Sequence, residues 1–417
     1  MTDQRRVLPA MGNVLVAVLL AGACTSAGAC TSAGGPILAN PTPALPAPAR
    51  PAASSSASPD PRPIELPRDD GPHDRLTEWW YDTGHLIGRA ANGMTRRFGF
   101  EFVVFRAERG SFPTTWASHL AITDESGDRF LYAQRSEIGG SVDHSPRTAS
   151  GDPSGFDLRV SGADPRDPAT LARLPWVMAG GDGHDRLEAR LSGPEASVAG
   201  VASMGLTLDL VATKPPTLHD GDGWIDFGPA GGSYYVSRTA LDATGSVDLD
   251  GTVYDVTGTA WFDHQWGDFI SVGGGGWDWF AVNLDDGTDL TISVVRAADG
   301  STALAYGTLV DETGRTRHLD SDGFTVTVTD HWTSPSTGAR YPAGWTVTIP
   351  GEDLVIDLRP TVADQELDTR TTTGVVYWEG SQHVRATRAG RYLGGEAYVE
   401  LTGYAPTTRS LPASPEP

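Results

Sequence analysis

The chain has 417 residues, with 31 Lys and Arg against 53 Asp and Glu, which gives a formal net charge of −22. That charge repels phosphate backbones and no basic run offsets it, so nucleic acid is excluded as a partner. The length suffices for two domains, each with its own core. The 50 Gly, 12 Trp, 11 Tyr and 12 Phe are typical of a turn-rich β protein and exclude disorder of the whole chain.

The N-terminus has the features of an export signal. Arg5 and Arg6 precede a short apolar run, 14–20, which is too short to span a bilayer stably. Cys24 follows small residues as in a lipoprotein cleavage site, and Cys30, in a near-copy of that stretch, is the alternative. We therefore expect an extracytoplasmic protein, anchored to the cell membrane by a lipid on Cys24 or plainly secreted. The chain has no other cysteine, so disulfides and thiolate chemistry are excluded from the folded part.

The remaining chain divides by composition. A Pro-, Ala- and Ser-rich stretch cannot bury enough surface to fold and predicts a linker. Beyond it, short alternating runs separated by Gly, Asp and Asn predict an all-β barrel or sandwich, with Pro168–Leu174 as the one stretch compatible with a helix. A weak internal repeat, in which residues 79–82 parallel residues 261–264, indicates two copies of one domain. The expected segments are a signal peptide (1–23), a linker (24–66), an N-terminal domain (67–243), a C-terminal domain (244–410) and a tail (411–417).

The run Glu78–His85 is dense in aromatic and ionisable side chains. On a strand, Glu78 and Trp80 share one face and Tyr81 lies on the other. Each face mixes rings with polar atoms, which suits the wall of a ligand cavity. The alternative is a first strand whose indole fills the bottom of a barrel while Glu78 forms a buried pair.

A carboxylate interrupts the apolar run Phe98–Phe105. Burying Glu101 unpaired is costly, so it is either protonated, and then a candidate acid, or paired with an arginine such as Arg106 or Arg296. His119, within a predicted strand, has a similar ambiguity between contact with a ligand and a structural role.

The segment Trp261–Asp268 gives the sharpest signal. His264 and Trp266 are two residues apart and share a face, and Asp263 is near enough in sequence to fix the imidazole tautomer. Further on, a run of four glycines leads into Trp277-Asp278-Trp279, a carboxylate between two indoles. Asp278 is thus a second candidate acid, with Trp277 and Trp279 as cavity walls.

Several common sites are excluded by their missing residues. The chain has no His-Glu-x-x-His pattern and no Gly-x-Ser-x-Gly elbow, which argues against a zinc hydrolase and a serine hydrolase. An apparent calcium loop around Asp220–Asp226 has Leu218 and Pro229 where carboxylate ligands are required. We expect neither a metal nor a cofactor.

Several motifs in order resemble the AttH-like, carotenoid 1,2-hydratase family. They include 78–81, 118–124, 233–239, 261–267, 277–280, 364–368, 377–380 and 398–404. The resemblance implies two tandem lipocalin-like antiparallel β-barrels with a site near their junction. It also implies addition of water to an isoprenoid double bond or, as in fungal relatives, guided cyclisation of a polyketide-type chain. The His-x-Trp pair of the hydratases corresponds to His264 and Trp266. Their Tyr-x-Asp pair corresponds to Gly276 and Asp278, with Gly in place of Tyr.

Two functions remain open at this stage. In the first, Asp278 or Glu101 protonates an alkene in an apolar cavity, indole rings stabilise the cation, and His264 positions the water. In the second, the barrels carry a long apolar ligand without changing it, and a structural role in the envelope is a third alternative. The candidate catalytic residues are His264, Trp266, Asp278, Asp263 and Glu101. The candidate ligand-binding residues are Glu78, Trp80, Tyr81, His119, Trp277 and Trp279.

Overall fold

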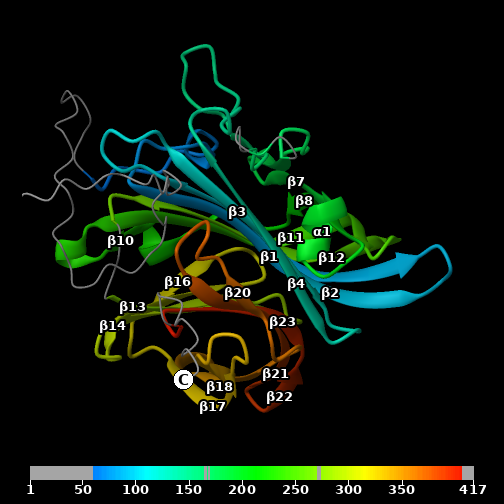
Figure 1. Cartoon of the computed structure of the whole chain (residues 1–417). Coiled ribbons are helices and arrows are strands. Elements are labelled where there is room, and N and C mark those ends of the chain that lie inside the picture. The colour runs from blue at the N-terminus through cyan, green and yellow to red at the C-terminus, as the bar shows by residue number, and fades with distance from the viewer. Residues whose placement is uncertain (1–59, 164–166, 168–169, 270–273, 406–417) are drawn as a thin grey trace, which may run out of the picture. The chain divides into compact units, whose positions relative to one another are not determined.

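The computed structural model describes residues 60–163, 167, 170–269 and 274–405 (Figure 1). The expected signal peptide, Cys24, Cys30 and the tail lie outside these residues. The described chain is almost entirely antiparallel β-structure in two large curled sheets, which confirms the expected tandem lipocalin-like architecture.

The first sheet has 12 strands, in the order β4-β3-β2-β1-β12-β11-β8-β7-β6-β5, with β9 and β10 also paired to β11. The strands are β1 (Thr77–Ala90), β2 (Thr95–Ala107), β3 (Thr115–Asp124), β4 (Arg129–Ile138), β5 (Phe156–Val160), β6 (Trp176–Gly181), β7 (His184–Ser192), β8 (Ser203–Ala212), β9 (Thr217–Leu218), β10 (Trp224–Asp226), β11 (Gly232–Leu249) and β12 (Thr252–Gly267).

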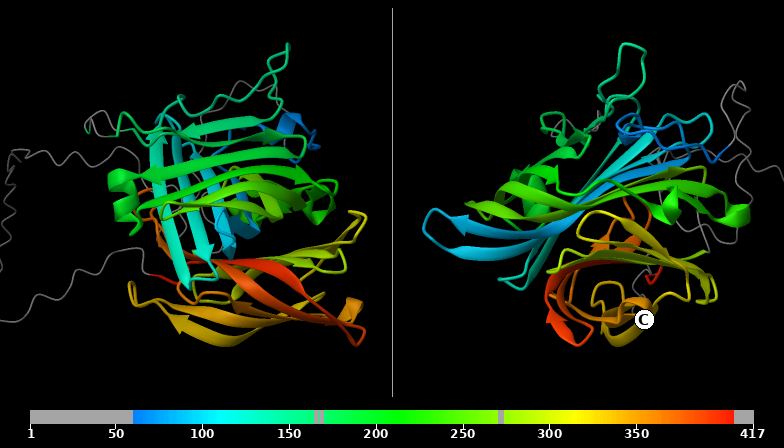
Figure 2. Two further views of the ribbon diagram at one scale, coloured as in Figure 1. Left: turned by 90° about the vertical axis from the view of Figure 1, so that its right-hand side faces the viewer. Right: turned by 180° about the vertical axis from the view of Figure 1, so that it is seen from behind.

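The second sheet has 11 strands, in the order β16-β15-β14-β13-β23-β21-β19-β18-β17, with β20 and β22 paired to β21. Its strands are the ones coloured from yellow to red in Figure 2. The strands are β13 (Gly274–Leu284), β14 (Asp289–Ala297), β15 (Thr302–Val310), β16 (Thr316–Leu319), β17 (Thr325–Thr333), β18 (Arg340–Ile349), β19 (Leu354–Pro360), β20 (Glu366–Asp368), β21 (Val376–Arg388), β22 (Arg391–Leu393) and β23 (Gly395–Thr402).

The chain passes from the first sheet to the second between Gly267 and Gly274. This is further along than the boundary expected near Thr244, which lies within β11 and pairs with β8 and β12. Gly245 does not interrupt the strand, because it serves a close approach of two backbones. A Cβ at this position would lie 2.0 Å from the carbonyl oxygen of Thr207.

Helical structure is sparse. The one α-helix of the described residues, α1 (Gly193–Val198), is not at Pro168–Leu174, whose described residues form turns and coil. Four 3₁₀ turns complete the helical elements: η1 (Arg68–Asp70), η2 (His219–Gly221), η3 (Gly228–Ala230) and η4 (Pro350–Glu352). Within the described chain, every helix is too short or too polar to traverse a bilayer.

The last residues of the expected linker are ordered, contrary to the prediction. Ile64 and Leu66 pack against Tyr234 and Trp266, and the hydroxyl of Tyr234 donates to Asp60 at 2.8 Å. Ile64 and Leu66 are large apolar side chains at the end of the Pro-, Ala- and Ser-rich stretch. Burying them favours an ordered chain.

Strands of the first sheet that lie against the second sheet, such as β2, bury both of their faces. In β2, Phe100 and Phe102 point into the core of the first sheet, whereas Val103 and Phe105 belong to a cluster that includes Trp279 of β13. Alternation along the strand therefore directs one set of side chains to the strand's own barrel and the other set to the second sheet. This double burial explains why Phe98–Phe105 is apolar on both faces.

Hydrogen bonds from side chains of one sheet to side chains or backbone carbonyls of the other also join the sheets. The ring Nε2 of His85 lies 3.0 Å from the carbonyl oxygen of Ala397, and Lys214 donates to Asp289 at 2.7 Å. Since no strand ladder runs from one sheet to the other among the described residues, these contacts and the shared apolar cluster hold the two sheets together.

The burial of Phe102 in β2 can be tested by making the same substitution there and at Phe112, which lies beyond the end of the strand. Phe102 is fully buried, so Phe102→Ala is expected to lower the free energy of unfolding by about 3–5 kcal/mol. Phe112 is 65% exposed, so Phe112→Ala is expected to change it by no more than about 0.5 kcal/mol. Denaturant titration measures both changes in the free energy of unfolding, and equal changes would contradict the burial of Phe102.

Candidate functional site

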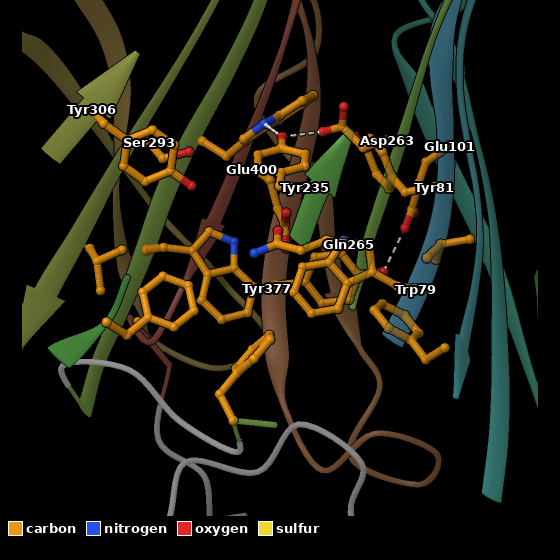
Figure 3. Close-up of a pocket in the computed structure, with 18 residues that line it drawn as sticks. Trp79, Tyr81, Glu101, Tyr235, Asp263, Gln265, Ser293, Tyr306, Tyr377 and Glu400 are labelled. Carbon is orange, nitrogen blue, oxygen red and sulfur yellow. Dashed lines mark hydrogen bonds between the residues drawn. The ribbon is translucent and has the colours of Figure 1, made fainter. Parts of the chain in front are cut away.

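A cavity of about 110 Å³ lies between the two sheets (Figure 3). Ten of its 18 lining residues are aromatic, and among these described lining residues there is no Lys, Arg or His. Its ionisable groups are three carboxyls and four phenols. The lining residues are Trp79, Tyr81, Glu101, Val103, Phe105, Phe227, Tyr235, Asp263, Gln265, Phe269, Gly276, Trp277, Trp279, Ser293, Val295, Tyr306, Tyr377 and Glu400.

Glu101 enters this cavity from β2. It is 1% exposed, and burial raises its pKa to about 8, so the carboxyl is protonated at neutral pH. The hydroxyl of Tyr377 donates to Oε1 at 2.8 Å, while no described residue bonds Oε2. Of the two alternatives that the sequence left open, protonation or pairing with an arginine, the structure favours protonation.

Asp263 enters from β12 and has a different environment. Its carboxylate accepts hydrogen bonds from Tyr235, from Ser237 and, at 2.7 Å, from Nε1 of Trp261. Burial raises its pKa to about 6 in spite of these donors, so the group is mainly ionised at neutral pH. Two of the three carboxyls that line the cavity therefore differ in charge, because Glu101 is mainly protonated and Asp263 is mainly ionised.

Two further carboxyls surround this pair. Burial raises the pKa of Glu400, on β23, to about 7. Glu379, on β21, lies behind Tyr81, whose hydroxyl donates to it at 2.7 Å. Burial, together with the charges of Glu101 and Glu400, raises the pKa of Glu379 well above its ordinary value. Like charges at this density cannot all ionise in a cavity without cations, so part of the set is held neutral.

Five of the residues predicted from the sequence line the cavity: Tyr81, Glu101, Asp263, Trp277 and Trp279. The structure therefore brings together residues from four separate segments of the sequence. Their roles in binding or catalysis remain predictions.

His264 and Trp266 do not line the cavity, contrary to expectation. They lie on the opposite face of β12 from Asp263, because successive side chains of a strand alternate. Asp263 therefore cannot orient the imidazole. Instead Nε2 of His264 lies 3.0 Å from Oε1 of Glu78, and the ring stacks on Trp80, with 4.6 Å between ring centroids.

Glu78 and Trp80 belong to this second cluster and to the barrel core, not to the cavity. The ligand atoms of His73, Glu78 and His264 lie within 4.8 Å of one another, a set that could hold a metal ion. However, Glu78 already accepts hydrogen bonds from the backbone and ring of His73 and from His264. Burial would raise the pKa of Glu78, but the charge of His73 and these hydrogen bonds lower it to about 2. These hydrogen bonds therefore join His73, Glu78 and His264 to one another in this structure.

Asp278 also lies outside the cavity. It sits between two cavity-lining indoles on β13, and alternation turns it toward the interior of the second sheet. The hydroxyl of Tyr404 donates to both of its oxygens at 3.0 Å, and Arg296 is 3.5 Å away. Burial raises its pKa to about 6. Arg296, a candidate partner for Glu101, pairs with Asp278 instead.

His119 lies one layer behind the cavity wall. Its Nδ1 is 2.7 Å from the hydroxyl of Tyr377, so it contacts a lining residue rather than the cavity itself. Burial lowers its pKa to about 3, which keeps the ring neutral. Sequence reasoning did not single out Tyr377, Glu400 or Tyr235, although each alternates with apolar residues in a motif that carried the family resemblance.

Two curled antiparallel sheets with a carboxyl-lined cavity between them define a tandem lipocalin-like protein. The model of the AttH-like family matches residues 57–404, and the chain belongs to that family. An AttH from Nitrosomonas europaea is 29% identical with a TM-score of 0.67, over 84% of this chain and 100% of that one. Kievitone hydratase from Nectria haematococca has the same fold at 16% identity and a TM-score of 0.56, over 82% and 93%. No curated protein matches the chain.

The protonation of Glu101 predicts a pH-dependent stability. A carboxyl whose pKa is raised on folding stabilises the protein below its unfolded value, and this contribution is lost as the pH rises through its folded value, about 8. The stability of wild type relative to Glu101→Gln should therefore fall with rising pH, by at most about 1.4 kcal/mol per pH unit. Denaturant titrations at several pH values measure this difference. Exposed Glu188→Gln controls for the loss of a carboxyl, and a pH-independent difference for Glu101→Gln would contradict the assignment.

Proposed function

We propose that this protein adds water to a carbon–carbon double bond of an apolar ligand bound between the two sheets. The observation that carries the proposal is the pair Glu101 and Asp263, whose environments place one carboxyl protonated and the other ionised in the same aromatic cavity. The naming of kievitone hydratase, a protein of the same fold, as a hydratase agrees with this reaction class.

Glu101 is the proposed acid. Its O–H bond breaks as the π electrons of the alkene take the proton and form a C–H bond, leaving a carbocation and a carboxylate. Such a transfer needs a carboxyl that is still protonated at neutral pH, and a buried group with a pKa of about 8 meets that requirement. Its free oxygen, Oε2, is the atom available to a ligand.

Asp263 is the proposed base. A water molecule attacks the cation, forming the C–O bond, and its surplus proton passes to the Asp263 carboxylate. The hydroxyl groups of Tyr235 and Ser237 and the indole of Trp261 hold that carboxylate in place. The net change is addition of one water to the double bond, with Glu101 left ionised and Asp263 protonated.

The wall of the cavity suits a cationic intermediate. Faces of Trp277 and Trp279 each stabilise a desolvated cation by about 1–2 kcal/mol, and no cationic side chain among the described lining residues opposes it. Exclusion of bulk water by the rings also strengthens the attraction between the cation and nearby carboxylates.

The reaction can be tested in D₂O with 3-methyl-2-buten-1-ol as the probe, a five-carbon branched alkenol that matches a cavity of about 110 Å³. Wild type is expected to give a product heavier by one D₂O, with one deuterium bound to carbon and not exchangeable. Glu101→Gln should lower the rate by about 100-fold or more, because it removes the proton donor. Asp278→Asn, outside the cavity, is the matched control and should retain activity. Probe that is retained but recovered unchanged from wild type would overturn hydration and favour a carrier.

We also propose that the chain is exported and anchored by a lipid on Cys24, on the strength of the leader sequence alone. Cys24→Ala is expected to move the protein from the membrane fraction to the soluble fraction, and Cys30→Ala is expected to leave it in the membrane. Immunoblots of the two fractions measure this, and the reverse pattern would assign the lipid to Cys30.

A further inference from the structure

A chain of hydrogen bonds leads away from Glu101 between the two sheets, through Tyr377 of β21 and His119 of β3 to Thr372. The hydroxyl of Tyr377 joins Glu101 Oε1 at 2.8 Å and His119 Nδ1 at 2.7 Å. On the far side of the ring, His119 Nε2 lies 3.0 Å from the hydroxyl of Thr372. Glu101, His119 and Tyr377 are buried, whereas Thr372 is partly exposed and its neighbour Thr371 is exposed. The chain therefore connects the cavity to a position near solvent.

We propose that Thr372, His119 and Tyr377 form a proton relay that recharges Glu101 after each reaction. This inference rests on the proposed function, in which Glu101 ends ionised while Asp263 takes the proton of the attacking water. The acid must then be reprotonated before a second ligand can react. A route that enters behind the cavity wall allows this while ligand or product still fills the cavity.

The relay is balanced at every bond. The phenol proton of Tyr377 passes to Oε1 of Glu101, and the phenol oxygen takes the proton on Nδ1 of His119. Nε2 of the same ring takes the hydroxyl proton of Thr372, whose oxygen takes one from water. One proton enters at Thr372 and one arrives at Oε1 of Glu101, so no group along the route keeps a charge. Rotation of the Glu101 carboxyl then turns this O–H toward the cavity, and the His119 ring and the hydroxyl groups reorient before the next proton passes.

The protonation states of the two inner groups suit this task. Burial lowers the pKa of His119 to about 3, so the ring is neutral and carries one N–H donor and one bare nitrogen acceptor. Burial and the neighbouring carboxyls raise the pKa of Tyr377 well above its ordinary value, so its hydroxyl keeps a proton. Neither group competes with Glu101 for charge.

The ring tautomer must follow the charge of Glu101. When Glu101 is ionised, Tyr377 donates to it, His119 Nδ1–H donates to Tyr377, and Nε2 accepts from Thr372. When the shared oxygen of Glu101 is protonated, each donor reverses. Nε2–H then donates to Thr372, whose hydroxyl can donate to Oε1 of Gln134 at 2.7 Å. Both arrangements pair every proton along the chain.

The titratable groups around the relay are acidic or phenolic. Those facing Glu101 and Tyr377 are Tyr81 from β1, Glu379 from β21, and Tyr398 and Glu400 from β23. Phe105 packs against His119, with 5.2 Å between ring centroids. Since these groups oppose a second negative charge, recharging Glu101 from the relay is favoured over leaving it ionised.

The tautomer switch gives a test that needs no ligand. Nitrogen-15 NMR of the full chain with labelled histidine is recorded from about pH 5 to about pH 9, and the His119 signals are assigned by their loss in His119→Asn. As Glu101 ionises near its pKa of about 8, the His119 proton is expected to move from Nε2 to Nδ1 while the ring stays neutral. A ring that keeps one tautomer throughout, or that becomes cationic, would overturn the relay.

Two variants test whether the His119 tautomer switch depends on the hydrogen bonds between Glu101, Tyr377 and His119. Glu101→Gln cannot ionise, and Tyr377→Phe removes the middle hydroxyl, so both should fix the tautomer at all pH values. Asp263→Asn, on the other side of the cavity, is the control and should retain the switch. A switch that survives in Tyr377→Phe would also overturn the relay. A switch in a protein that fails to hydrate the probe would count against the proposed function alone, and turnover without a switch would count against the relay alone.

Discussion

The candidate site depends on one constraint: the outward face of the first sheet is buried against the second sheet. Val103 and Phe105 of β2 and Trp279 of β13 share an apolar cluster, and the same faces carry Glu101 and Asp263. Carboxyls on an outward face would ordinarily be solvated and ionised. Here the second sheet removes the water, and the cost of an isolated buried charge becomes a shift in pKa.

The charge of the cavity follows from what its wall lacks. Paired with an arginine, as Asp278 is with Arg296, a buried carboxyl can remain ionised. Glu101 has no such partner among the described residues, only the hydroxyl of Tyr377, so it keeps its proton. Asp263 accepts three hydrogen bonds, which favour its charged form. The arginine beside Asp278 and the three hydrogen-bond donors around Asp263 thus distinguish these two carboxyls from Glu101.

Alternation predicted much of the fold and only part of the site. It correctly placed Trp80 and Tyr81 on opposite faces of β1, but it could not tell which face met a cavity. His264 lies on the face of β12 that is turned away from the cavity, whereas its neighbour Asp263 lines the cavity. The contact of Tyr377 with Glu101 joins residues 276 positions apart, on different sheets, and no local pattern indicates it.

The departure from the hydratase motif at Gly276 has a steric cause. Its φ of 87° is a conformation that side chains disfavour, and a Cβ there would lie 2.4 Å from the carbonyl oxygen of Thr402. A tyrosine cannot occupy this position without moving β23. The phenols of the cavity come instead from Tyr81 and Tyr235 of the first sheet and from Tyr306 and Tyr377 of the second sheet. If a phenol is needed beside the acid, this chain supplies it from β21, where the same hydroxyl also touches His119.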